Sequence, residues 1–379
     1  MHRVITKTVL FFFAGLLFFS LPAGAGESLC KTWPAWDSFR SKFVSDEGRV
    51  IDRSLPQHVT TSEGQSYALM FALIANDRAS FDLILRWTEN NLAGGDLTGR
   101  LPAWDWGQRA DGSWGVIDAN AAADADLWIA YALGEAGRLW NDPKYTALAE
   151  LLAARILREE TADLPGLGLV LLPGPKGFHS DDVTWRLNPS YLPMQVVRRF
   201  AVTYPESDWK KIAGTSLEII VRSAPFGFAP EWIDYQAGKG FVAVGPAVSG
   251  TSFNAIRVYL WAGMLDSRDP AYAVLLKKLA PMGYHVASNG ALLVMDSGGT
   301  IKESASAGFS SALLPFLKAA KQKAALHQQK QRLVALAPLD RADNYYDQVL
   351  TLFGQGWIEE RYKFDRNGML KPRWKCTSR

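Results

Sequence analysis

Acidic residues at the predicted starts of two buried helices are the side chains best placed for chemistry. Glu63 stands near the beginning of TTSEGQSYALMFALI (60–74), whose apolar second half predicts a buried helix. Asp124 and Asp126 open a second apolar helix in AAADADLWIAYAL (121–133). A pair of carboxyl groups can hydrolyse a glycosidic bond, because one protonates the leaving oxygen while the other acts from the opposite side of the sugar.

A purely structural interpretation of the same acids is open from the sequence alone. The pairs Thr60-x-x-Glu63 and Ser62-x-x-Gln65 both fit a capping box, in which the later side chain returns a hydrogen bond to the start of the helix. Carboxylates in a first turn also compensate the helix dipole. The functional alternative makes Glu63 a general acid at the mouth of a buried helix.

Aromatic residues in a loop favour a sugar-binding groove. The segments LPAWDWG (101–107) and DGSWG (111–115) place three of the chain's 14 Trp among Gly and Pro residues that predict irregular structure. Exposed aromatic faces stack on the flat faces of sugars or bases, and buried ones fill cores. Three tryptophans in one loop are hard to explain as core alone.

Other classes of function receive no support from the sequence. The five His show no metal-ligand spacing, and neither a phosphate loop nor a G-x-S-x-G elbow is present. A net charge of +3 over 379 residues argues against a dedicated nucleic-acid binder. We therefore expect neither a metal nor a cofactor.

The N-terminus is typical of a secretory signal peptide spanning 1–25. Positive charge precedes an apolar centre at 9–21, and Ala-Gly-Ala at 23–25 fits a cleavage site. We expect residues 26–379 to form a single domain without a membrane span, in the periplasm or outside the cell. Cys30 and Cys376 lie near the two mature ends, and an oxidising compartment would favour a disulfide between them.

Hydrophobic periodicity predicts helices through most of the remaining chain. Gly/Pro-rich connections separate them, and a short strand is predicted at 241–244. About a dozen helices with long loops predict an all-α toroid whose function lies in the loops on one face. A basic stretch at 318–332 is interpreted as a solvated helix face. The expected helices cover 79–92, 143–158, 191–201, 209–223, 253–265, 271–282, 307–329 and 342–353.

Several motifs together resemble the family-8 glycoside hydrolases, over nearly all of the mature chain. The resemblance implies an (α/α)6 barrel, with long loops forming a substrate cleft on one face, and endo-hydrolysis of a β-1,4-glucan chain with inversion. It also implies a periplasmic role in bacterial cellulose export, with a functional link to the cellulose synthase complex. The motifs are TSEGQSY (61–67), LPAW (101–104), AADADLWIA (122–130), NPSYLP (188–193), AIRVYLW (255–261) and LTLFGQGW (350–357).

Residue roles follow from the positions that match the family's motifs. Glu63 falls on the proton donor, and Asp124 falls on the acidic signature position, where we expect it to hold the sugar at the cleavage subsite. Asp126 is interpreted as structural. Trp104 and Tyr191 are candidates for sugar contacts, with core packing as the alternative.

One position departs from the family pattern. The resemblance implies an aspartate base just before Ala-Ile-Arg, and this chain has Asn254 in SFNAIR (252–257). An amide cannot accept a proton from water at neutral pH. Arg257 follows about one helical turn later, so it can face the same way and orient substrate, or water through Asn254.

Three explanations of Asn254 are open from the sequence. Another base can replace the missing one, with the loop residues Asp181, Asp182, Asp234 and Asp296 as candidates. Alternatively, the chain is a weakened or inactive glucan-binding protein that assists export, or Asn254 is an introduced substitution. A further alternative is a family member that acts on chitosan or xylan.

Overall fold

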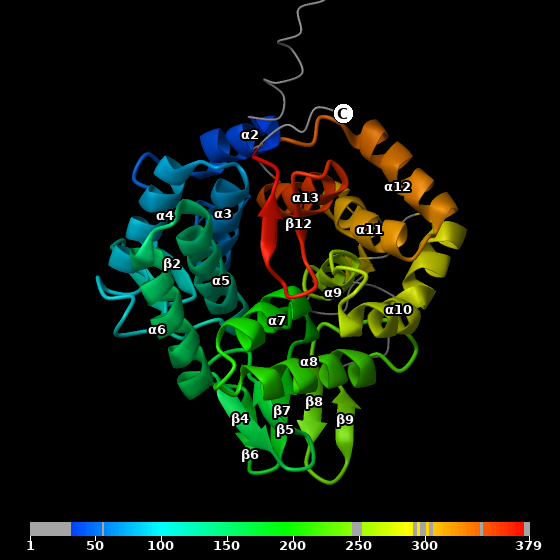
Figure 1. Ribbon diagram of the computed structural model, residues 1–379. Helices are drawn as coiled ribbons and strands as arrows, with labels where there is room; N and C mark the ends of the chain where they lie inside the picture. The colour runs from blue at the N-terminus through cyan, green and yellow to red at the C-terminus, as the bar shows by residue number, and fades with distance from the viewer. Residues whose placement is uncertain are drawn as a thin grey trace, which may run out of the picture.

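The structure is a ring of helices in two layers. It is a computed structural model that describes residues 32–54, 57–244, 252–290, 294–295, 301–302, 306–341 and 344–374. Helices of the inner layer alternate along the chain with helices of the outer layer, as Figure 1 shows. This arrangement confirms the predicted all-α (α/α)6 barrel.

Burial separates the two layers. The inner helices α3 and α9 bury nearly every side chain, whereas outer helices such as α4 and α6 bury one face, as their amphipathic sequences require. The inner layer contains α3 (Ser62–Ile74), α5 (Ala123–Trp140), α7 (Met194–Thr203), α9 (Ala255–Gly263), α11 (Ala307–Ala319) and α13 (Tyr345–Ile358). The outer layer contains α2 (Pro34–Phe43), α4 (Arg78–Asn91), α6 (Pro143–Glu159), α8 (Trp209–Ser223), α10 (Pro270–Asn289) and α12 (Lys323–Leu336).

Aromatic side chains close the centre of the ring. The ring of Phe353 on α13 contacts Tyr67 and Phe71 on α3, with centroids 5.1 and 4.6 Å apart. Trp128 on α5 and Trp261 on α9 approach to 5.2 Å. Edge-to-face and tilted pairs of this kind add about 0.5–1.5 kcal/mol each beyond their area burial. The core therefore fixes the inner helices against one another and, with them, the side chains at their ends.

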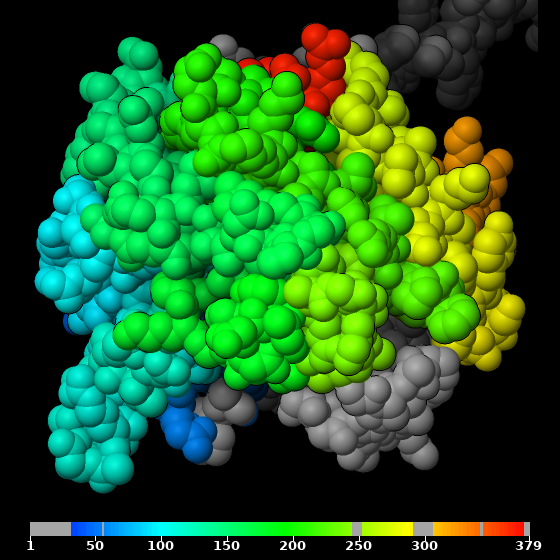
Figure 2. All heavy atoms as spheres, turned by 90° about the horizontal axis from the view of Figure 1, so that it is seen from below, coloured from blue at the N-terminus to red at the C-terminus, as the bar shows by residue number. Residues whose placement is uncertain are grey.

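The chain also forms small antiparallel sheets, and two of them lie at the end of the ring where the inner helices begin. In Figure 2 the β2–β3 hairpin projects from this end, while the C-terminal residues lie at the opposite end. The first sheet pairs β1 (Thr60–Thr61), β2 (Asp105–Gln108) and β3 (Trp114–Asp118), and the second pairs β6 (His179–Asp181), β7 (Thr184–Leu187), β8 (Ile233–Gln236) and β9 (Gly240–Ala243). Two further pairs are β4 (Thr161–Leu164) with β5 (Gly168–Leu171), and β10 (Val294–Met295) with β11 (Ile301–Lys302).

The opposite end of the barrel is closed by the hairpin of β12 (Tyr362–Phe364) and β13 (Leu370–Pro372). The Tyr131 hydroxyl donates to the carbonyl of Gly368 at 2.7 Å, and the Glu135 carboxylate accepts from the amide of Leu370 at 3.0 Å. Gly368 has φ of +72°, and a Cβ there would collide with the carbonyl of Gln195, so this turn requires glycine. The hairpin is thereby fixed against α5 and covers this end of the barrel.

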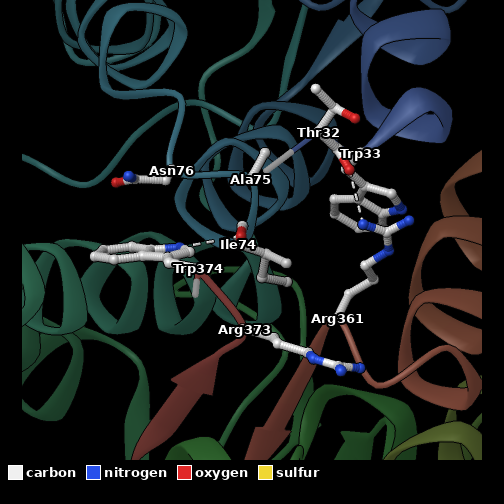
Figure 3. Close-up of a pocket in the computed structure, with 8 residues that line it drawn as sticks. All are labelled: Thr32, Trp33, Ile74, Ala75, Asn76, Arg361, Arg373 and Trp374. Atoms are coloured by element: carbon white, nitrogen blue, oxygen red, sulfur yellow. Dashed lines mark hydrogen bonds between the residues drawn. The ribbon is translucent and has the colours of Figure 1, made fainter. Parts of the chain in front are cut away.

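A cavity of about 330 Å³ lies beside this closed end (Figure 3). Trp374 crosses it and donates to the carbonyl of Ile74, at the C-terminal end of α3 and away from Glu63. Cys30 and Cys376, and the signal peptide expected at 1–25, lie outside the described residues. Thr32 and Trp374 line this same cavity, and each is two positions from one of these cysteines. The disulfide between Cys30 and Cys376 stays a prediction.

Two helices differ from the sequence-based predictions. The helix expected over 307–329 is two helices, because the chain turns at Lys321, where φ is +57°, and the Gln322 amide bonds back to Leu317. The short helix α2 was not predicted, whereas the strand expected at 241–244 is confirmed as β9. In the described part of the chain, no helix combines the length and the apolar character that a membrane span requires.

Candidate active site

Four inner helices bring their first turns together at the open end of the barrel. Glu63 is the second residue of α3, Asp124 the second of α5 and Tyr346 the second of α13. Arg257 lies in the first turn of α9, and its guanidinium is the point on which the other side chains converge.

The guanidinium of Arg257 binds both candidate carboxylates through one nitrogen. Nη1 donates to the Glu63 carboxylate, to the Tyr67 hydroxyl at 2.6 Å and to Asp124 Oδ2 at 2.8 Å. Nη2 donates to Ser190 Oγ at 3.2 Å. The Arg257 side chain is only 3% exposed, and a buried cation of this kind is tolerable only when anionic partners compensate it. Arg257 and the two acids therefore form one electrostatic unit.

Glu63 does not cap its helix, so both capping boxes expected from the sequence are wrong. The N-cap is Thr61, whose hydroxyl accepts from the Gly64 amide at 3.1 Å. Gln65 turns away and accepts from the Val50 amide at 2.6 Å. Glu63 instead meets Arg257 and accepts from the Tyr346 hydroxyl. Its side chain is 25% exposed, against 2% for Asp124, so Glu63 is the acid of this pair that a substrate can reach.

Gly64 allows α13 to approach the first turn of α3. A Cβ at this position would collide with the hydroxyl of Tyr345, the buried first residue of α13. Because Gly64 leaves this space, the next residue of α13, Tyr346, reaches Glu63 with its hydroxyl at 2.7 Å. The glycine in the TSEGQSY motif thus allows Tyr346 to hold the Glu63 side chain in place.

Asp124 is enclosed on both of its oxygens. Oδ1 accepts from the amide of Ala125 at 2.9 Å, and Oδ2 is bound by Arg257. Burial raises the pKa of Asp124 to about 6; Arg257 lowers it and Glu63 adds to the rise. A carboxylate without a free oxygen suits a positioning group better than a nucleophile or a base that must meet water.

Asp126 points away from this cluster and meets Glu160, at the end of α6. Both side chains are fully buried. Within the described residues, none of the four oxygens of these two carboxyls has a hydrogen-bond partner. Burial raises the pKa of both groups well above the ordinary range, and Asp126 raises that of Glu160 further. Burial therefore favours the neutral, protonated form of both carboxyls, which supports a structural role for Asp126; Glu160 was not identified from the sequence.

We expect Glu160→Gln to weaken the pH dependence of stability. Because the folded-state pKa is raised, stability is fully present below about pH 4 and falls as the pH rises toward the folded-state value. Removing one of the two protonatable groups should reduce the loss of unfolding free energy between pH 5 and pH 8 by roughly 1–2 kcal/mol. Urea unfolding at both pH values measures this, with the exposed Glu218→Gln as the matched control. An unchanged pH slope would contradict the raised pKa of Glu160.

Asn254 is the N-cap residue of α9 and links Arg257 to a residue that the sequence analysis did not identify. Its Oδ1 accepts from Arg257 Nη2 at 2.5 Å, and its Nδ2 donates to Glu231 Oε1 at 3.0 Å. Glu231 lies in the loop between α8 and β8. No motif or spacing distinguishes it in the sequence; only the fold places it beside Asn254.

Aromatic rings flank the cluster. The Tyr191 ring lies 5.5 Å from the Arg257 guanidinium, and Trp232 continues the row at 6.2 Å from Tyr191. Trp104 lies beside Glu63, because its carbonyl accepts from the amide of Ser62 at 3.0 Å. The side chain of Trp104 is 38% exposed. All six predicted site residues, Glu63, Trp104, Asp124, Tyr191, Asn254 and Arg257, thus lie at one end of the barrel.

Comparison with known proteins shows the family to which the chain belongs. The sequence model of the glycosyl hydrolases family 8 matches residues 16–360. The chain belongs to this family. The endoglucanase of Escherichia coli K12 is 44% identical over 93% of this chain and 94% of that protein, and the endoglucanase of Xanthomonas axonopodis pv. citri is 46% identical over 94% of each. The crystal structure of an endo-1,4-D-glucanase from Vibrio fischeri superposes with a TM-score of 0.85 at 45% identity, covering 90% of this chain and 99% of that one. The protein is therefore a glycoside hydrolase.

Two of the four loop aspartates considered as replacement bases in this family-8 enzyme are engaged elsewhere. Asp181 accepts from the Val183 amide within its own hairpin, and Asp234 pairs with Arg186 across β7 and β8, with Nε 2.9 Å from the carboxylate. Asp182 is exposed, and Asp296 lies outside the described residues. The carboxylate that meets Asn254 is Glu231, which the sequence analysis omitted.

Within the described residues, no cluster of three or more His, Cys, Asp or Glu side chains could hold a metal ion. Glu63 and Asp124, the two acids at the open end, both pair with the Arg257 guanidinium.

Proposed function

We propose that the protein hydrolyses internal bonds of β-1,4-glucan by an inverting acid–base mechanism, with Glu63 as the proton donor. The observation that carries the proposal is the position of Glu63. It is the partly exposed carboxyl of the cluster, fixed by Arg257 and Tyr346, with the exposed Trp104 beside it. A positioned acid of this kind contributes about 10²–10⁴ in rate.

In the proposed reaction, a glucan chain lies along the aromatic rings at the open end. Trp104 on one side and Tyr191 with Trp232 on the other offer apolar faces to sugar rings. Glu63 protonates the leaving oxygen, and Asp124 with Arg257 holds the sugar at the cleavage subsite. Water attacks the anomeric carbon from the opposite face, which inverts its configuration.

The alternative of a retaining mechanism would make Asp124 the nucleophile. Glu63 and Asp124 bind the same nitrogen of Arg257, so their nearest oxygens lie no farther apart than the roughly 5–5.5 Å that separates the two carboxyls of retaining enzymes. Against this role, Asp124 is 2% exposed and both of its oxygens accept hydrogen bonds. A nucleophile needs an unobstructed oxygen facing the anomeric carbon, so we assign Asp124 to positioning.

The biological setting is also part of the proposal. The signal-like residues 1–25 support export, and the resemblance to periplasmic endoglucanases supports action on glucan made during cellulose export, in functional association with the synthase complex. The names of the relatives that are 44–46% identical favour glucan over chitosan or xylan. A cold-adapted xylanase of the same family is 15% identical and shows the fold alone.

We expect the first product released from cellohexaose to have the α configuration at its new reducing end. Proton NMR recorded before mutarotation measures this directly, because the two anomeric protons have separate signals. Carboxymethylcellulose should be cleaved faster than xylan or chitosan in parallel assays. A β-anomer as the first product would instead indicate retention and return Asp124 to the role of nucleophile.

A further inference from the structure

The site lacks a base at the position where the family resemblance implies one. Inversion requires a group that takes a proton from the attacking water, and the amide of Asn254 has no useful basicity. Glu63 is assigned to proton donation, and both oxygens of Asp124 are occupied. The carboxylate in direct contact with Asn254 is Glu231, whose Oε1 accepts from Nδ2 at 3.0 Å.

We infer that Glu231 is the general base of this enzyme and that Asn254 positions it and the attacking water. The inference rests on the proposed hydrolytic function and adds a catalytic residue to it. In the reaction, the water oxygen bonds to the anomeric carbon while the bond from that carbon to the glycosidic oxygen breaks. Glu63 gives its proton to the leaving oxygen and Glu231 takes one from the water, so both groups exchange a proton with solvent before the next cycle.

Hydrogen bonds fix the orientation of the Asn254 amide. Arg257 Nη2 can only donate, so the atom of Asn254 that meets it must be Oδ1, and Nδ2 consequently faces Glu231. An aspartate at this position would place two carboxylates in contact, which like-charge repulsion disfavours. Asparagine is therefore the residue that allows a carboxylate at 231 to be held in this place.

The backbone on both sides of Glu231 is anchored. The Ala229 amide donates to the hydroxyl of the fully buried Tyr259 at 2.9 Å. After Glu231 the chain enters β8, where Ile233 pairs with Leu187 on one side and Ala243 on the other. A side chain held between two such anchors keeps its position relative to α9, as a base must for efficient proton transfer.

The series of contacts keeps Glu231 apart from Glu63. The guanidinium of Arg257 and the amide of Asn254 lie between the two carboxylates, joined by hydrogen bonds. Inverting enzymes need carboxyl groups about 6.5–9.5 Å apart, so that a sugar carbon and a water molecule fit between them. Trp232, the next residue after Glu231, packs beside Tyr191, so Glu231 also borders the aromatic row proposed to bind the glucan.

The test compares Glu231→Gln and Glu231→Ala with the unaltered protein and with the exposed control Glu218→Gln. On cellohexaose we expect both Glu231 variants to lose about 10²–10⁴ in kcat, the usual contribution of a general base, with thermal stability and cello-oligosaccharide binding retained. Added azide, which needs no deprotonation, should restore turnover of Glu231→Ala in proportion to its concentration. The product should be the α-glycosyl azide, detected by mass spectrometry and NMR.

The outcomes separate this inference from the proposed function. An active parent protein with a fully active Glu231→Gln variant overturns the assignment of Glu231 and leaves the hydrolytic function standing. Loss of activity in Glu231→Ala without formation of glycosyl azide also overturns it, because a residue that only supports Asn254 gives no such product. An inactive parent protein overturns the proposed function and this inference together.

Discussion

Glu63→Gln is expected to lower kcat on carboxymethylcellulose by about 10²–10⁴-fold, the usual contribution of a general acid. The amide keeps the shape of the side chain and can still accept from Arg257 and Tyr346, but it has no proton to give to the leaving oxygen. Binding of cello-oligosaccharides should be nearly unchanged, since the sugar contacts assigned to Trp104 and Tyr191 remain.

A substrate with a better leaving group sharpens this prediction. Fluoride departs without full protonation, so Glu63→Gln should hydrolyse β-cellobiosyl fluoride at a rate close to that of the parent protein. Glu218→Gln, on the exposed face of α8, is the matched control and should keep both activities. An equal loss on both substrates would show that Glu63 holds the site together and is not the proton donor.

Arg257→Met is expected to lower the unfolding free energy by about 3–5 kcal/mol and to abolish activity. The substitution removes the one cation that the buried Asp124 and the nearby Glu63 share, and leaves Asp124 as an uncompensated buried charge. Because the loss of Arg257 raises the folded-state pKa of Asp124 above its value of about 6, the destabilisation should be smaller at pH 5 than at pH 8. Urea unfolding at both pH values measures the effect.

A double substitution separates charge from packing in this prediction. Asp124→Asn added to Arg257→Met removes the uncompensated charge, so it should recover a large part of the lost stability without restoring activity. If Arg257→Met alone proves as stable as the parent protein, the electrostatic unit described at the open end does not exist as stated.

The barrel could be predicted from the sequence because its inner helices are apolar on nearly every side. A run such as ALMFALI in α3 can only be buried, and repetition of such runs implies a closed ring. The break after α11 was missed because the turn at Lys321 carries neither Gly nor Pro. A left-handed backbone conformation at a lysine cannot be predicted from the residue type.

The site was predictable in part for a similar reason. Glu63, Asp124 and Arg257 lie within motifs, so their identity could be carried over, but the role of Glu63 depends on which side chain caps α3. Thr61 takes that place because Thr60, in β1, pairs with Trp106 of β2. Trp106 lies more than forty positions further along the chain, so the sequence around Glu63 does not reveal this pairing. Glu231 and Asn254 are 23 positions apart in the sequence, and the strands β8 and β9 lie between them. No local sequence pattern predicts their contact.

The most direct test of the account is a time course of carboxymethylcellulose hydrolysis by the purified chain carrying its own Asn254. We predict that viscosity falls early while few reducing ends have formed, since internal cleavage shortens long chains first, and that reducing ends then accumulate steadily. Glu63→Gln measured alongside should show neither change. If the unaltered chain releases no reducing ends over background at any pH between 4 and 8, yet binds cello-oligosaccharides, the protein is a glucan binder on a hydrolase scaffold and the account is contradicted.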